Sequence, residues 1–209
     1  MSQAAAMPGG EQARPMPGFK MYNVKLGMWV FLLSEVMFFT SLIGTYIILR
    51  LAHPEQFAAP GEVLNVPLTA INTFILICSS VTMVKAYAAV EQDDQKGLKL
   101  WLLATILLGS TFVGVQVYEY IHLFHDGFLP NAEAYAAAGG PLYGSTFYLM
   151  TGFHGLHVAI GVGALIWLLI RAMGGTYHSK RLGGVEAVGL YWHFVDLVWI
   201  VLFTIVYLI

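Results

Sequence analysis

Charge is scarce in this chain. Its 209 residues include ten basic and twelve acidic side chains, so charged residues make up 11% of the sequence. A soluble domain usually carries roughly 25% charged residues, and this deficit leaves too few to cover a surface in contact with water. The net charge of −2 excludes a nucleic-acid-binding protein with a basic surface, because neutralising phosphates requires a strong positive excess.

Cysteine is nearly absent, and Cys78 is the only thiol. One cysteine excludes an internal disulfide framework and a CxxC or cysteine-rich metal site. The first 22 residues lack the apolar stretch of a secretory signal, so we expect a flexible cytoplasmic tail over 1–22 and one transmembrane domain over 23–209. Glycine and proline do not interrupt corresponding apolar runs, which weakens a transporter interpretation without removing it.

Apolar residues are abundant instead, at 58% of the chain, and the mean hydropathy is +0.71. A helix needs roughly 20 apolar residues to cross about 30 Å of hydrocarbon, and five runs reach that length. The expected helices cover about 26–49, 66–90, 97–121, 143–170 and 188–209. The sequence therefore predicts an all-α membrane protein, a bundle of five transmembrane helices.

The basic residues predict the orientation of the bundle, because Lys and Arg in short loops stay preferentially on the cytoplasmic side. With a cytoplasmic N-terminus, every basic residue except Arg50 falls on the inner face. We therefore expect the N-terminus inside and the C-terminus outside. Three inner-face residues, Arg171, Lys180 and Arg181, could hold anionic lipid headgroups.

Glu35 is the first ionisable group expected inside the membrane. It lies ten residues after Lys25, about 15 Å along a helix and therefore near the middle of the bilayer. Its helical neighbours are Phe31, Phe38 and Phe39, and burial among them favours the neutral acid. Two interpretations stay open: a carboxyl that exchanges protons or regulates, and a buried acid hydrogen-bonded to another helix, most plausibly to a histidine of the fourth run.

Two further pairs of polar residues have helical spacing. His154 and His157 lie three residues apart in the fourth run, and His193 and Asp196 are related in the same way in the fifth. These groups could ligate a metal or a haem, but no HExxH or Glu-x-x-His motif accompanies them. An interhelical polar network that includes Glu35 is the favoured interpretation, and we expect no metal and no catalytic residue in this chain.

Small and polar stripes predict how the helices meet. Gly155, Ala159 and Gly163 form a small-residue stripe suited to close helix packing. Thr69 and Asn72 are expected to hydrogen-bond between helices.

A polar stripe near the outer end of the third run could contact a partner or cap the bundle, or could be a solvated helix end. It consists of Gln116, Glu119 and His122. Four tryptophans are expected to be interfacial anchors: Trp29, Trp101, Trp167 and Trp192.

Several longer motifs resemble subunit III of the haem–copper respiratory oxidases. They are GMWVFLLSEVMFFTS (27–41), VPLTAINTFILICSS (66–80), GVQVYEY (114–120), YGSTFYLMTGFHGLHVAIG (143–161) and YWHFVDLVWIVLF (191–203). Together they cover all five expected spans.

The resemblance implies a subunit that binds no haem or copper itself and packs beside the catalytic subunit I of a proton-pumping oxidase in a bacterial plasma membrane. Partner subunits would carry haem and copper, with subunit II and a small subunit IV in the same complex. The family's carbodiimide-reactive carboxylate maps onto Glu35, its paired histidines onto His154 and His157, and its terminal-helix pattern onto His193 and Asp196. The implied roles are support of proton uptake, protection of subunit I and binding of structural phospholipids.

Mitochondrial-type members resemble seven-helix chains, and this chain begins at the equivalent of their third helix, like the shorter bacterial form. The glutamate in LLSEVMFF favours a cytochrome c oxidase over a quinol oxidase, and relatives associated with nitric oxide reductase stay possible. Two alternatives lie outside the family: a b-type haem membrane protein that uses the histidines, and a small secondary transporter that uses Glu35.

Overall fold

The computed structural model describes residues 19–58, 61–130 and 140–209 of the chain. Five long helices cross the molecule, and each is long and apolar enough to span a membrane, which confirms the predicted all-α bundle. They are α1 (Phe19–Ala52), α2 (Val66–Glu91), α3 (Gln95–His125), α4 (Pro141–Met173) and α5 (Gly183–Phe203). A short 3-10 turn η1 (Pro54–Gln56) follows α1, and a π-helical turn η3 (Thr204–Leu208) follows α5.

Each helix except α2 begins or ends beyond the apolar run that predicted it, whereas α2 matches its run to within one residue. The helix α1 begins at Phe19, so the expected tail over 1–22 is wrong for its last four residues, and 1–18 lie outside the described residues. A helix extends through polar residues outside the hydrocarbon as far as its capping residue. Hydropathy does not mark the position of that residue. The side chain of Asn65 caps α2 by accepting from the backbone of Leu68, and Asp94 caps α3 in the same way.

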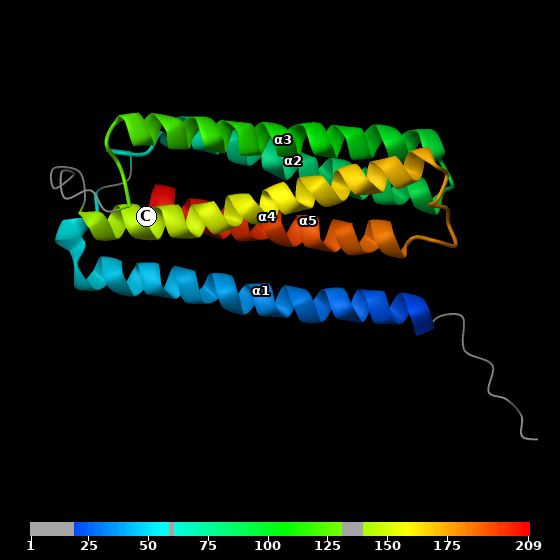
Figure 1. Cartoon of the computed structure of the whole chain (residues 1–209), viewed down its shortest axis with the longest axis horizontal. Coiled ribbons are helices and arrows are strands. Elements are labelled where there is room, and N and C mark those ends of the chain that lie inside the picture. The colour runs from blue at the N-terminus through cyan, green and yellow to red at the C-terminus, as the bar shows by residue number, and fades with distance from the viewer. Residues whose placement is uncertain (1–18, 59–60, 131–139) are drawn as a thin grey trace, which may run out of the picture.

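The helices lie in three layers, as Figure 1 shows. The α2–α3 hairpin forms one side, α4 and α5 lie in the middle, and α1 lies on the other side, in contact with α4 and α5. The start of α1 and the C-terminus lie at opposite ends of the bundle. The α2–α3 and α4–α5 connections share the end at which α1 starts, which gathers most of the basic side chains there.

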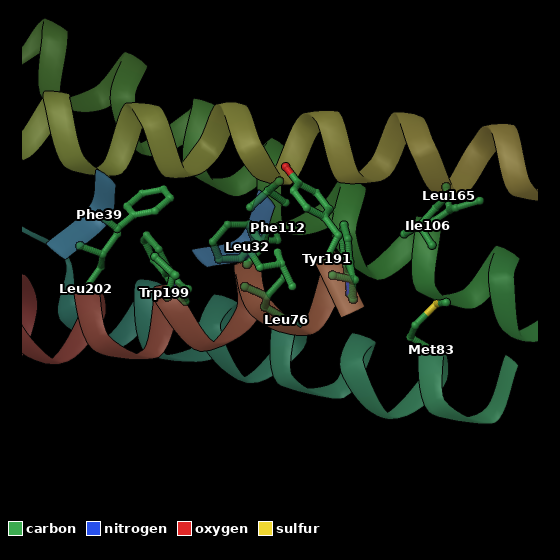
Figure 2. Close-up of a cluster of buried hydrophobic side chains, with 14 of the residues drawn as sticks. Leu32, Phe39, Leu76, Met83, Ile106, Phe112, Leu165, Tyr191, Trp199 and Leu202 are labelled. Carbon is green, nitrogen blue, oxygen red and sulfur yellow. The ribbon is translucent and has the colours of Figure 1, made fainter. Parts of the chain in front are cut away.

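The core of the bundle is formed mainly by aromatic and branched side chains. Figure 2 shows Leu32 and Phe39 of α1 reaching a cluster that also holds Leu76, Phe112 and Trp199. The tightest packing surrounds another tryptophan, Trp192, which is 1% exposed.

Glycines make room for the indole of Trp192. A Cβ atom placed on Gly109 would lie 2.5 Å from this ring, and one on Gly161 would lie 2.9 Å from it. Only glycine lets α3 and α4 approach the indole so closely. Trp192 is therefore a core residue, and its expected role as an interfacial anchor is wrong.

Candidate functional site

A carboxyl and an imidazole meet between α1 and α4. Glu35 Oε2 lies 3.1 Å from His157 Nε2. Both residues lie near the middle of their helices, so the pair is about half-way across the bundle. The side chains are 17% and 14% exposed, which leaves the pair at the edge of the protein rather than in its core.

The second ring nitrogen of His157 limits where protons can reside. Nδ1 lies 2.6 Å from the backbone oxygen of Phe153, and a carbonyl oxygen only accepts, so Nδ1 carries a hydrogen. Nε2 then either accepts from a protonated Glu35 or, in a charged imidazolium, donates to the Glu35 carboxylate. In both forms Glu35 and His157 share one proton and are neutral as a pair.

The surroundings of the pair are aromatic and open toward the outside of the bundle. The ring of Phe39 lies 5.1 Å from that of His157, and Tyr191 donates a hydrogen bond to the His157 backbone oxygen at 2.9 Å. A pocket of about 390 Å³ lies beside the pair and is lined also by Met28 and Ile160. A small apolar reagent can therefore reach Glu35 from the lipid side.

His154 lies in a different environment from His157. It is fully buried, its ring stacks on Trp199 at 4.8 Å, and the edge of Phe112 lies 6.0 Å away. Neither ring nitrogen of His154 has a hydrogen-bond partner among the described residues. The three-residue spacing thus places one histidine against α1 and the other in the aromatic core.

His193 and Asp196 of the fifth run also lie in different surroundings. Asp196 accepts a hydrogen bond from Ser80 on α2 at 2.6 Å, while His193 lies one turn earlier and is partly exposed. The five polar residues predicted as one network therefore occupy three places: the Glu35–His157 pair, the His154 core position and the α2–α5 contact. Within the described ranges, no group of three His, Cys, Asp or Glu side chains lies close enough to hold a metal ion.

The predicted small-residue stripe does not mediate close helix contacts along its whole length. Gly155 meets Gln116 of α3, where an added Cβ would lie 2.8 Å from the amide oxygen. Ala159 and Gly163 are exposed, and a Cβ on Gly163 would meet nothing within 4 Å. Within this chain the stripe therefore makes a close contact at Gly155 only, and the face of α4 that meets α5 carries Gly161 instead.

A buried network near the C-terminal end of α3 was left undecided by the sequence. Glu119 is 6% exposed and lies 3.1 Å from the Thr69 hydroxyl and 3.3 Å from the Tyr207 hydroxyl, both of which donate to it. Gln116 donates to the backbone oxygen of Thr151. Of the predicted polar stripe only His122 is solvated, in an exposed pair with Asp126. The expected interhelical role of Thr69 is confirmed, as is that of Asn72, which donates to Phe112.

The opposite end carries the basic side chains expected to meet lipid. Arg171, Lys180 and Arg181 are all exposed around the α4–α5 connection. This connection is tied to the α2–α3 turn, since the Asp93 carboxylate accepts from both the backbone and the hydroxyl of Ser179, at 2.6 and 2.7 Å. These two hydrogen bonds hold the pKa of Asp93 below its usual value.

Comparison with known proteins fits this architecture. The family described as cytochrome c oxidase subunit III matches the chain over residues 18–209. The chain belongs to this family. The match covers all five helices, including the Glu35–His157 pair and the polar positions of α5.

Members of the subunit III family from several bacteria are similar along nearly their whole length. Cytochrome c oxidase subunit 3 of Thermostichus vulcanus is 37% identical, over 95% of this chain and 92% of that protein. A probable cytochrome c oxidase subunit 3 of Nocardia farcinica is 36% identical over the full length of both chains. A probable quinol oxidase subunit 3 of Staphylococcus haemolyticus is also 36% identical, over 88% of each. Membership of the subunit III family therefore does not choose between the two kinds of electron donor.

Proposed function

We propose that this chain is the subunit III of a proton-pumping terminal oxidase in a bacterial plasma membrane, where it packs beside the catalytic subunit I. In this proposal haem and copper belong to partner subunits, among them subunit II and a small subunit IV, and the complex reduces O2 to water. The chain itself stabilises subunit I, supports proton uptake and binds phospholipid. The observation that carries the proposal is the family match over residues 18–209.

The Glu35–His157 pair supports a role in proton handling. A proton can move between Oε2 and Nε2, across 3.1 Å, without creating net charge inside the hydrocarbon. An isolated charge there would cost several kcal/mol, so a pair that stays neutral in both forms is suited to holding an exchangeable proton. The open pocket beside the pair leaves Glu35 accessible from the membrane side.

The inner-end basic residues support a role in holding lipid. Each Lys or Arg near an anionic membrane surface contributes roughly 1 kcal/mol of attraction, and Arg171, Lys180 and Arg181 are exposed together at one end. Trp167 lies beneath the Arg171 guanidinium, 5.3 Å from it, and fixes that side chain near the end of α4. Ordered lipid at this end would stabilise the contact with subunit I.

Deleting the chain from the oxidase tests the accessory role. We expect unchanged haem spectra, a lower initial rate of O2 consumption and faster inactivation over successive turnovers. Full haem content with no initial activity would contradict the proposal, because it would assign an indispensable chemical step to this chain. A haem signal from the isolated chain in a pyridine haemochrome assay would favour a b-type haem protein instead.

A hydrophobic carbodiimide tests the proton-exchangeable carboxyl. The reagent needs a protonated acid in apolar surroundings, so we expect labelling at Glu35 and its loss in Glu35→Gln. Glu119 is the control, because it is also a carboxyl on a membrane-spanning helix but is enclosed by Thr69 and Tyr207. Labelling of Glu119→Gln should equal that of the unmodified chain, and persistent labelling of Glu35→Gln would identify a different reactive acid.

A further inference from the structure

The inner half of α5 forms the floor of a trough. A hollow of about 260 Å³ lies between α1 and α5, with Trp29 and Leu33 on its α1 side. A second hollow, of about 220 Å³, lies between α2 and α5, with Val84 and Tyr87 on its α2 side. Leu190 and His193 line both hollows, so the two meet along α5.

The trough has the length and surface of a helix-binding site. From Glu186 to Leu197 the floor spans about 16 Å, or three helical turns, in the half of α5 that Figure 1 draws in orange beside α1. Positions 190 and 193, which are partly exposed, and 197, which is exposed, follow the three- and four-residue spacing of a helix face. The apolar walls are well exposed, with Leu33 and Leu197 each 61% accessible.

Polar atoms in the trough distinguish a protein occupant from a lipid chain. His193 is partly exposed near the middle of the span, and no described residue makes a hydrogen bond to its ring. Acyl chains offer neither donors nor acceptors, whereas a polar side chain of another membrane helix offers both.

We propose that this trough, formed by α5 between α1 and α2, binds one transmembrane helix of a partner subunit, and that a polar side chain of that helix hydrogen-bonds His193. The inference rests on the proposed place of the chain in an oxidase complex. To that proposed place the inference adds which face of the chain meets a partner and which chemical group makes the contact. The opposite side of α1, with the Glu35–His157 pair, lies outside this surface.

Photo-crosslinking in the intact complex tests the trough. A benzophenone amino acid replaces Leu197 in the trough or, as a matched control, Leu107 on α3, since these leucines are 61% and 59% exposed and both lie near mid-helix. We expect at least about tenfold more crosslinking to a membrane-spanning segment of a co-purifying subunit from position 197. Equal yields, or crosslinking only to lipid from position 197 while haem still co-purifies, would overturn the inference and leave the proposed function standing.

A chain that co-purifies with no haem-bearing partner would contradict the proposed function and the inference together. The polar contact has a test of its own in His193→Phe, which keeps the bulk of the ring and removes both nitrogens. Retention of the partner through a detergent wash should fall about 3- to 30-fold, the range for one interhelical hydrogen bond. The control His125→Phe, at the exposed end of α3, should retain the partner fully. Equal retention by both variants would overturn the hydrogen bond to His193.

Discussion

The helix α1 is as apolar as the helices α2 to α5, but it is attached to the bundle in a different way. In an 18-residue apolar stretch of α1 only 11% of the residues are buried, whereas 28% to 44% are buried in the corresponding stretches of α2 to α5. The helices α2 to α5 are joined by buried hydrogen bonds such as Trp192 to Ser79, at 3.0 Å, and Trp199 to Thr73, at 2.8 Å. We call α2 to α5 the four-helix core.

The first helix is attached at separate points along its length. Lys25 pairs with Glu186 at 2.6 Å at one end, Glu35 meets His157 in the middle, and Arg50 donates to a backbone oxygen of the last residue at the other end. Between these points only Leu32, Phe39 and Tyr46 are buried. Substitutions in the four-helix core should therefore affect folding, whereas substitutions along α1 should affect local attachment and function.

The largest effect is expected where the four-helix core is tightest. In Gly161→Leu the new side chain collides with Trp192, and we expect a loss of about 3 kcal/mol or more of stability. Gly163→Leu is the control, since a Cβ there meets nothing within 4 Å and the stability should change by less than about 0.5 kcal/mol. Thermal unfolding of the detergent-solubilised complex measures both. Similar unfolding temperatures for the two variants would show that the indole is not confined as described.

A smaller loss is expected from the buried network around Glu119. Glu119→Ala removes an acceptor from Thr69 and Tyr207. Thr69 keeps its hydrogen bond to the Asn65 backbone oxygen, but leaving the buried Tyr207 hydroxyl unpaired costs about 2 kcal/mol. Asp126→Ala breaks only the exposed pair with His122 and should cost less than about 0.5 kcal/mol. The same unfolding assay applies. A loss for Asp126→Ala as large as that for Glu119→Ala would mean that the two carboxylates are similarly solvated.

Loosening the middle of α1 should have a local effect. His157→Phe removes the partner of Glu35, a contact worth about 0.6 to 1.7 kcal/mol for a hydrogen bond between membrane helices. Hydrogen exchange followed by mass spectrometry should then be faster in α1 and unchanged in the four-helix core. His122→Phe is the control for loss of an exposed histidine. Faster exchange throughout all five helices would show that α1 is as integral to the fold as the others.

The smallest effect concerns the connection between α4 and α5 and its dependence on pH. Because the pKa of Asp93 is lowered in the folded protein, its bonds to Ser179 contribute stability above the unfolded value near 3.9 and lose it as pH falls through the folded value. The protection of the Ser179 amide from exchange, relative to its intrinsic rate at each pH, should therefore fall below about pH 4. Asp93→Asn, which tolerates the left-handed backbone at φ 57°, should remove this acid dependence. An identical pH profile in Asp93→Asn would contradict this role of the Asp93 carboxylate.

The number and type of helices could be predicted because each apolar run is long enough to cross a bilayer. The ends of α2 could also be predicted, at 66–90 against Val66–Glu91, but those of the other helices could not, since capping residues such as Asp94 lie outside the hydrocarbon. The depth of Glu35 and His157 follows from counting residues along a helix. Which of the fourth-run histidines meets Glu35 depends on how α1 and α4 are rotated, which spacing alone does not determine.

Burial was the hardest property to predict, for a reason particular to membranes. In a soluble helix the polar face marks the solvent side, but here lipid-facing and core-facing positions are both apolar, so the faces look alike. For this reason the prediction for Trp192 was wrong and that for Glu119 stayed open. An indole or a carboxyl near the end of an apolar run is compatible with an interface as well as with a core. The glycines at 109 and 161 were the available signal for Trp192, since they lie on two different helices and leave space for a large ring.

The position of Trp192 between Gly109 and Gly161 has a consequence for biosynthesis. The indole belongs to the last long helix of the chain, and it fills the space between two helices that are synthesised before it. Helices α3 and α4 can enter the bilayer earlier, but their final contact includes a ring that has not yet been translated. The bundle therefore closes only after α5 has been inserted, and a ribosome that stalls before codon 192 leaves a chain with a gap at its centre.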